Sequence, residues 1–264
     1  MPARSRRRGK ARREATAEVA LIVGGGPGIS ASCARLFAGE DMRVAVAART
    51  PDKPALLKLE EDHDVRRYGC DASDPDAVAS LFEAVGRDLG DPIFVVHNID
   101  GRMADIFRKG IHQADRELVR QVLHNSAYSA FLVGREATRR MLAGPEPEGD
   151  GHRGTIIFTN ASGALKGFAR SGAFAMACHA KAGLAQSMAR ELGPKGIHVA
   201  HVPIDAAIGW TQDDGSRWHR MAGTAVDDNM ADPDRIADLY LQLHRQHRST
   251  WAFEVVLRPW VETW

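Results

Sequence analysis

The stretch EVALIVGGGPGIS, residues 18–30, decides the fold. It begins with a short apolar run, and GGGPGIS at 24–30 then opens a helical pattern at 28–39. Glycine in such a turn lets backbone N–H groups approach a pyrophosphate at the positive end of a helix. On its own the turn is a weak signal, because a glycine-rich turn can also simply join a strand to a helix. Its position directly after an apolar strand strengthens the phosphate-binding interpretation.

Apolar runs alternate with amphipathic stretches along the rest of the chain. The runs that predict strands are 18–24, 43–48, 65–70, 92–97, 154–160, 197–203 and 251–258. The stretches that predict helices are 28–39, 75–89, 114–143, 172–192 and 232–246. The strands lack clean period-2 alternation, as expected where both faces of a sheet are covered. We therefore predict an α/β fold, a doubly wound parallel sheet of about seven strands with helices on both faces.

The composition is that of an ordinary globular protein, with 44% hydrophobic and 26% charged residues in a chain of 264. No apolar run is long enough for a membrane span, and no signal-peptide core follows the basic N-terminus. Cys33, Cys70 and Cys178 lie far apart with no CxxC pair, which indicates reduced thiols and no metal site. We expect a cytoplasmic protein without a membrane partner.

The charge is unevenly distributed. Seven of the 35 Lys and Arg residues lie within residues 1–13, which leaves 28 basic against 34 acidic residues in the rest. We predict a disordered basic tail at 1–15 and one domain at 16–264, and we regard nucleic-acid binding by the tail as the less favoured alternative. Segment 208–230 has no clear period, and we predict that it is a lid over a small-molecule substrate. Its large side chains are Trp210, Trp218, His219 and Met221.

Four segments together resemble the short-chain dehydrogenase/reductase family. VGGGPGIS at 23–30 is similar to its TGxxxGxG loop, and LAQSMARELGPKGIHVAHV at 184–202 to the segment that leads from its catalytic helix into the sixth strand. CDASDP at 70–75 and HNID at 97–100 fall where the family has an adenine-contacting aspartate and its NNAG motif. The resemblance implies a Rossmann-type fold, a nicotinamide dinucleotide, and a homodimer or homotetramer formed through the helices at 114–143 and 172–192.

The resemblance also implies a set of cofactor-binding residues: Gly24, Gly26, Gly28, Ile29, Ser30, Arg49, Asp71, Ala72, Asn98 and Lys181. Ser30 replaces the last glycine of the loop, and three of the four NNAG residues are replaced. Arg49, at the end of the second strand, can pair with a 2′-phosphate, whereas an acidic residue there would repel it. NADP(H) is therefore favoured over NAD(H), although a solvated arginine at a strand end would give the same sequence.

The catalytic positions depart furthest from the family pattern. Lys181 matches the lysine of the family's Tyr–Lys pair, but Ala177 stands four residues earlier, where the tyrosine is expected. The chain has only three tyrosines, and none lies on this helix. Ala161 or Ser162 falls at the serine position, and of these only Ser162 can hold a substrate oxygen. Ser126 falls at the asparagine place, with Asn125 one residue away, so the catalytic candidates are Lys181, Ser162 and Ser126.

Two functions remain open at this point. The first is an NADP(H)-dependent oxidoreductase acting on a carbonyl or imine of a small organic substrate with a degenerate tetrad, where water, a substrate group or Ser162 replaces the tyrosine proton. The second is a cofactor-binding protein of the same fold. It would catalyse non-redox chemistry, such as cyclisation, isomerisation or dehydration, or serve as a non-catalytic sensor or subunit.

Overall fold

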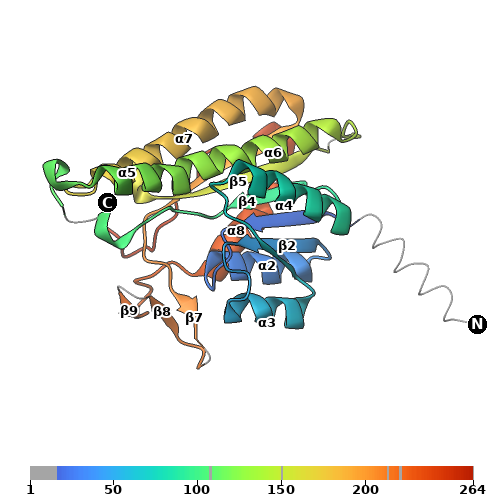
Figure 1. Cartoon of the computed structure of the whole chain (residues 1–264). Helices are drawn as coiled ribbons and strands as arrows, with labels where there is room; N and C mark the ends of the chain where they lie inside the picture. Colours follow the sequence, from blue (N-terminus) through green and yellow to red (C-terminus); the bar gives the residue numbers. More distant parts are fainter. Residues whose placement is uncertain (1–16, 107–108, 150, 213, 220–221, 264) are drawn as a thin grey trace, which may run out of the picture.

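The computed structural model describes residues 17–263 except 107–108, 150, 213 and 220–221 (Figure 1). The basic tail predicted at 1–15 lies outside the described residues. Six parallel strands form the main sheet: β1 (Val19–Val23), β2 (Arg43–Ala48), β3 (Arg66–Gly69), β4 (Phe94–His97), β5 (Gly154–Ala161) and β6 (Ile197–Ile204). Their order is β3-β2-β1-β4-β5-β6, which is the order of a doubly wound Rossmann sheet. The predicted fold class is thus confirmed.

The seventh predicted strand, 251–258, is not a strand of this sheet. It runs beside β6 and makes only isolated parallel bridges, His201 with Glu254 and Ile204 with Leu257. The N–H groups of His201 and Asp205 donate to this segment at 2.7 and 2.8 Å. Between them stands Pro203, which has no N–H to donate, so the ladder is interrupted at its centre.

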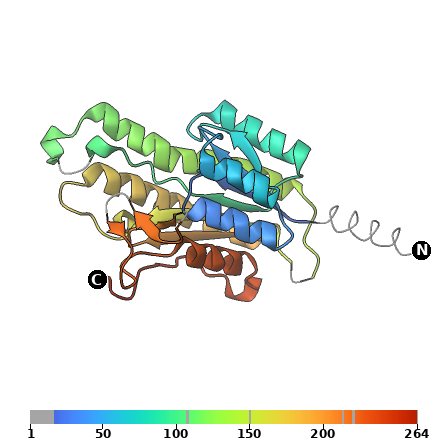
Figure 2. The same ribbon diagram turned by 90° about the horizontal axis from the view of Figure 1, so that it is seen from below.

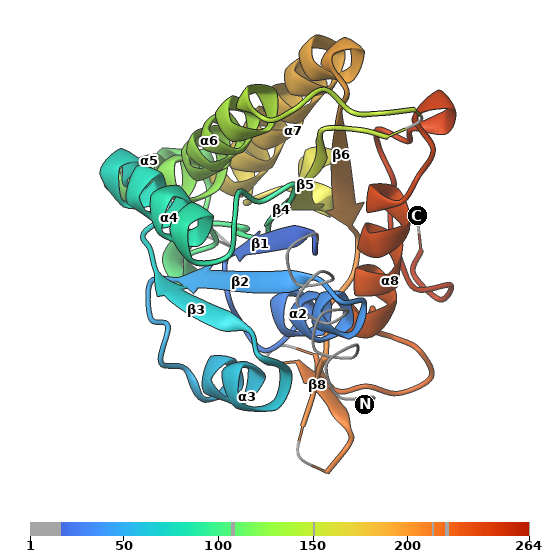
Figure 3. The ribbon, with the colours of Figure 1, turned by 90° about the vertical axis from the view of Figure 1, so that its right-hand side faces the viewer.

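Helices cover both faces of the sheet (Figures 1 and 3). One face carries α4 (Pro75–Asp88), α5 (Arg116–Leu123), α6 (Ser129–Ala143) and α7 (Gly172–Leu192), and the other carries α2 (Ile29–Gly39), α3 (Pro54–His63) and α8 (Pro233–His244). Figure 2 shows α2 and α8 lying side by side. Alternate residues of β1 enter the two cores, with Ile22 on the α2 side and Leu21 on the α4 side. None of the described helices combines the length and apolar character needed to cross a membrane.

Two helix predictions need correction. The helix expected at 114–143 is divided into α5 and α6 by a π-helical turn at His124–Tyr128. Such turns are rare and occur mostly at functional sites. Helix α3 was not predicted, because it is short, four of its ten residues are charged, and it buries only Leu56 and Leu59. Its sequence signal is Pro54 at the first helical position.

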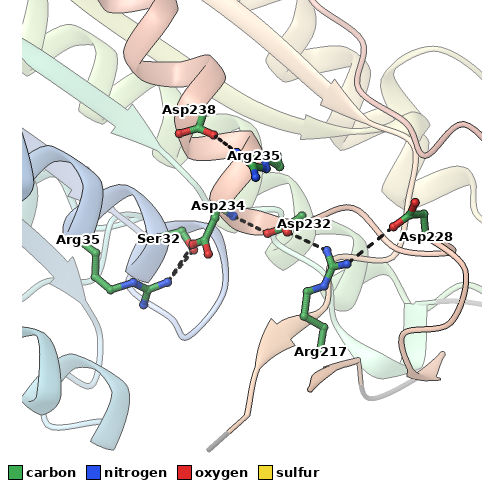
Figure 4. A network of polar contacts seen from close by, with 8 residues as sticks. All are labelled: Ser32, Arg35, Arg217, Asp228, Asp232, Asp234, Arg235 and Asp238. Atoms are coloured by element: carbon green, nitrogen blue, oxygen red, sulfur yellow. Dashed lines mark hydrogen bonds and ion pairs between the residues drawn. The ribbon is translucent and has the colours of Figure 1, made fainter. Parts of the chain in front are cut away.

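The segment predicted to lack regular structure contains a small antiparallel sheet. Its strands are β7 (Trp210–Thr211), β8 (Arg217–His219) and β9 (Gly223–Thr224). Arg217 pairs with Asp232 at the start of α8 at 3.0 Å and approaches Asp228 at 4.0 Å (Figure 4). The first turn of α8 also joins α2 through an Asp234–Arg35 pair at 3.0 Å. We call residues 208–230 the lid segment; Met221 lies outside the described residues.

Candidate functional site

A pocket of about 940 Å³ opens at the carboxyl ends of the strands. It lies at the switch point between the parallel strands β1 and β4, where the strand order reverses and where sheets of this type bind nucleotides. The predicted residues that line it are Gly24, Gly26, Gly28, Ile29, Ser30, Arg49, Asp71, Ala72, Asn98 and Ser162. Two predicted residues, Lys181 and Ser126, are fully buried and are not part of this lining.

The glycine turn forms what we call the nucleotide end of the pocket, residues 24–30 with Arg49, Asp71, Ala72 and Asn98. Gly24 has a φ of +107°, and a Cβ there would lie 2.4 Å from the carbonyl oxygen of Asn98. Only glycine fits this position. Added Cβ atoms at Gly26 and Gly28 would meet nothing within 4 Å, so open space faces this part of the turn.

Ser30 adds two hydrogen bonds to the turn. Its hydroxyl donates to the Gly24 carbonyl at 2.8 Å and accepts from Nδ2 of Asn98 at 2.7 Å. The side chain therefore ties the glycine turn to the residue that follows β4. Because Ser30 is buried and these two bonds use its hydroxyl, replacing the family glycine leaves the pocket wall intact.

The electrostatics of the nucleotide end favour an anion. The first turn of α2 has neither a capping side chain nor an acidic residue, so its N–H groups face the pocket unopposed. Arg49 and Lys53 both line the pocket beside the turn, and Lys53 Nζ donates to the Gly25 carbonyl at 3.1 Å. Sequence reasoning missed Lys53 because it missed α3, the helix that Lys53 precedes. These groups fit the pyrophosphate and a further phosphate of a dinucleotide.

Asp71 and Ala72 form the side wall of the nucleotide end. The Asp71 carboxylate accepts from the Ser73 hydroxyl at 2.7 Å and from the Ser73 N–H at 3.0 Å. These hydrogen bonds hold the pKa of Asp71 below its ordinary value. Asp71 is exposed at the pocket rim, and the sequence-based expectation that it contacts the adenine remains a prediction.

Lys181 lies behind the pocket wall. Its ammonium donates to the carbonyl of Ile99 and, at 3.2 Å, to the carbonyl of Thr159. Burial lowers the pKa of Lys181 from its ordinary value of 10.5 to about 8. Ile99 and Thr159 both line the pocket, so Lys181 connects the segments that follow β4 and end β5. The structure gives it these backbone partners; its predicted contact with a ribose remains a prediction.

Ala177 is fully buried one turn before Lys181. It packs in a small apolar cluster with Ile106, Val122 and Ala173. Within the described part of the chain, none of the three tyrosines lines the pocket. Tyr240, for example, is buried on α8 and hydrogen-bonds Thr159 Oγ1 at 2.7 Å. No described phenol is therefore placed to exchange a proton in the pocket.

The π-helical turn places Asn125, and not the predicted Ser126, on the pocket wall. Ser126 is fully buried, and its hydroxyl has no hydrogen-bond partner among the described residues. It packs against Gly101, where an added Cβ would lie 2.8 Å from the Ser126 Cβ. The extra residue of a π-helical turn shifts which side chain faces the pocket, and sequence spacing does not reveal that shift.

Sequence reasoning also missed Ser129, which lines the pocket one turn after Asn125. Its hydroxyl lies 2.8 Å from Nε2 of His97, the residue in place of the first NNAG asparagine. Burial holds the pKa of His97 well below its ordinary value, so this histidine is neutral. The Ser129 hydroxyl also lies 2.7 Å from the Asn125 carbonyl, which makes it a donor within the helix.

The opposite end of the pocket is what we call the reaction end: Asp100, Arg102, Asn125, residues 160–162, Phe174, Trp210 and His219. Ser162 supplies a hydroxyl at the end of β5. Arg102 pairs with Asp100 and lies over the ring of Phe174, 5.4 Å from its centroid. Trp210 and His219 come from the lid segment, with ring centroids 6.2 Å apart. This end offers a hydroxyl, two amides, a guanidinium paired with a carboxylate, and three aromatic rings.

The sheet order, the glycine turn and the pocket at the switch point define a dinucleotide-binding α/β protein. The family model described as enoyl-(acyl carrier protein) reductase matches residues 24–252. The chain belongs to the short-chain dehydrogenase/reductase family, whose members are oxidoreductases that bind nicotinamide cofactors.

Individual relatives place the chain at moderate distance from known members. Momilactone A synthase from Oryza sativa subsp. japonica is 31% identical over 189 residues, which span 71% of this chain and 65% of that protein. The (+)-cis,trans-nepetalactol synthase from Nepeta racemosa is 26% identical over 86% of this chain and 83% of its own length. The crystal structure of a short-chain dehydrogenase from Rhodopseudomonas palustris is 30% identical with a TM-score of 0.73, covering 92% of this chain and 99% of that one.

Proposed function

We propose that the protein is an NADP(H)-dependent oxidoreductase that acts on a carbonyl or imine of a small organic substrate. The observation that carries this proposal is the intact nucleotide end, where Gly24, Ser30 and Asn98 form one hydrogen-bonded unit below the open α2 N-terminus. When bound, a nicotinamide nucleotide supplies or accepts a hydride equivalent. The chain binds and orients it through the turn, with Asp71 and Ala72 beside the adenine.

The preference for NADP(H) over NAD(H) rests on two cations. Arg49 and Lys53 line the pocket beside the end of β2, where Ala48 occupies the position of a discriminating acid. A 2′-phosphate there meets two positive charges, and arginine can bind it with two parallel hydrogen bonds. A ribose hydroxyl would meet no carboxylate acceptor at this position.

The reaction end determines which substrates fit. Ser162 holds the substrate oxygen, and for a carbonyl the proton that this oxygen needs comes from water, since no described phenol is available. Losing a positioned general acid costs about 10²- to 10⁴-fold in rate. The arrangement therefore favours activated carbonyls, or iminium cations, which hydride addition to carbon converts to neutral amines without any proton transfer. Trp210 and His219 of the lid segment cover this end.

A second candidate function is favoured by a specific observation. Ala177 is buried and Lys181 is held by backbone carbonyls, so two tetrad positions do not present acid or base groups to the pocket. The alternative is a cofactor-binding member of the family with non-redox catalysis, or one that acts as a sensor or subunit.

The proposal includes a homodimer or homotetramer in the cytoplasm. Phe131 on α6 and Met176 on α7 are 44% and 46% exposed, and a second copy packed on these helices would cover them. Light scattering at micromolar concentration should report two or four copies. A strictly monomeric protein contradicts this part of the proposal and leaves the nucleotide site untouched.

Calorimetric titration with NADPH and NADH tests the function. We expect NADPH to bind at least about tenfold more tightly, a difference of about 1.4 kcal/mol, and we expect Arg49→Ala and Lys53→Ala each to remove part of it. Arg87→Ala, an exposed arginine on α4 paired with Asp88, is the matched control. NADPH consumption with a panel of activated ketones and iminium ions then separates the two candidates. Binding without any consumption favours the non-redox alternative, and no nucleotide binding rejects both.

A further inference from the structure

The reaction end contains a cation that neither the nucleotide end nor the proposed chemistry uses. Arg102 lies on the segment that follows β4 and lines the pocket, with 40% of its side chain exposed. Phe174, on α7, lies under its guanidinium at 5.4 Å and lines the same part of the pocket. The two residues are 72 positions apart in the sequence, so the fold brings this cation and this ring together.

The orientation of Arg102 is fixed by Asp100. The Asp100 carboxylate binds Nε of Arg102 with one oxygen and accepts the Arg102 backbone N–H at 2.8 Å with the other. Burial alone would raise the pKa of Asp100, but the charge and hydrogen bonds of Arg102 hold it below its ordinary value, so the pair stays ionised. Because Asp100 takes the Nε side, the two terminal nitrogens of Arg102 have no hydrogen-bond partner among the described residues.

The surroundings leave room for an anion at those nitrogens. Among the described residues that line the pocket, the only carboxylates are Asp71, at the nucleotide end, and Asp100, which is already engaged. Phe174 lies against the guanidinium, and Trp210 lines the same pocket. This planar guanidinium packs against a ring, and its two terminal nitrogens have no hydrogen-bond partner among the described residues. Their spacing matches the two oxygens of a carboxylate.

We propose that Arg102 binds the carboxylate of the substrate, and that the substrate is an oxo acid with an aromatic or apolar body. This inference rests on the proposed function, since it names the substrate class of the same pocket. The substrate body packs between Phe174 and Trp210, and its carbonyl oxygen faces Ser162. The competing interpretation is that the Asp100–Arg102 pair only braces the loop after β4.

Benzoylformate and its methyl ester are suitable probes, because they share the ring and the ketone and differ in the negative charge. Their binding is measured by calorimetry on the full chain, both with and without saturating NADPH. We expect the acid to bind at least about tenfold more tightly than the ester. Arg102→Gln should make the affinities for the acid and the ester equal and leave the NADPH affinity unchanged. Arg102→Lys should keep only part of the preference for the acid, because an ammonium cannot bind a carboxylate in the bidentate geometry of a guanidinium.

Arg87→Gln, on the outside of α4, is the matched control and should keep the preference of the unmodified protein. Thermal unfolding checks that each variant is folded. If Arg102→Gln does not fold, the comparison is made with Arg102→Lys. Equal affinities for acid and ester, no measurable binding of either, or a preference that survives both Arg102 variants would overturn the proposal. If NADPH binds in these cases, only the oxo-acid assignment is lost. If NADPH does not bind, the proposed function fails, and the titrations without nucleotide still decide whether Arg102 binds a carboxylate.

Discussion

The two ends of the pocket are built in different ways. The nucleotide end is made mainly of backbone: a positive-φ glycine, the open first turn of α2, and two hydrogen bonds through Ser30. The reaction end is made of side chains, and of the three predicted catalytic residues only Ser162 lines it. Ala177 and Ser126 are buried, and Lys181 reaches the pocket only through two carbonyls. Backbone groups that bind a ligand are positioned by the fold itself. Each side chain of a catalytic set, in contrast, can be substituted without altering the fold.

The largest expected effect tests whether the nucleotide end depends on backbone geometry. Gly24→Val places a branched side chain at a φ of +107°, with its Cβ 2.4 Å from the Asn98 carbonyl. Left-handed strain of about 1–2 kcal/mol and overpacking of about 1–3 kcal/mol add to about 2–5 kcal/mol of lost stability. Urea unfolding measures the loss, and NADPH titration should show no binding.

Gly28→Ala is the control, since an added Cβ there meets nothing within 4 Å. It should change the free energy of unfolding by less than about 1 kcal/mol. Equal losses in the two variants would mean that the turn tolerates no side chain at all, and that the close approach of Gly24 to Asn98 has no special role.

Lys181→Met tests the buried cation behind the pocket wall. The folded chain releases the Lys181 proton at about pH 8, whereas the unfolded chain keeps it to its ordinary value of 10.5. Between these values the unfolded chain binds more protons, so the free energy of unfolding rises with pH. The stability of the unmodified protein relative to Lys181→Met should therefore increase by on the order of 2–3 kcal/mol from pH 7 to 10.

Urea unfolding of both proteins at several pH values measures this difference, and comparing them cancels groups that titrate in both. A difference that is constant from pH 7 to 10 would show that Lys181 keeps an ordinary pKa. The ammonium would then be hydrated in the folded protein, and its placement behind the pocket wall would be wrong.

The contrast between the two ends also explains what the sequence could predict. The apolar runs and the glycine turn predicted six strands and the nucleotide end, because these depend on local pattern. Pro203 interrupts the pairing of the seventh predicted strand because the fold places it opposite 251–258. Lys53 lies near the turn because it precedes a helix with a weak amphipathic signal. The Arg102–Phe174 contact and the burial of Lys181 join distant segments, and spacing along one helix carries no information about them.

Ser30→Ala gives a smaller effect and sharpens the role of the one side chain that joins the turn to Asn98. It removes two hydrogen bonds and leaves the Gly24 carbonyl and the Asn98 amide to find other partners. We expect a loss of about 1–2 kcal/mol in stability and a several-fold weaker NADPH affinity. Ser30→Gly introduces the family residue and should lower the free energy of unfolding at least as much as Ser30→Ala does. An unchanged free energy of unfolding in both variants would mean that the Ser30 hydrogen bonds do not stabilise the turn.

The smallest effect concerns the lid segment, which belongs to the reaction end through Trp210 and His219. Arg217→Ala removes its ion pair with Asp232 at 3.0 Å, while the hydrogen bond from the Asp234 N–H to Asp232 that caps α8 remains. The Arg217 and Asp232 side chains are 25% and 32% exposed, so the loss in stability should be at most about 1 kcal/mol and should shrink in high salt. Arg235→Ala, which removes an α8 surface pair with Asp238, is the control. Because Trp210 and His219 of the lid segment line the reaction end, we expect weaker binding of the benzoylformate probe and faster proteolysis near 210–224, with unchanged NADPH affinity. If NADPH affinity falls equally, the lid contributes to both ends, and the two ends cannot be treated as separately built.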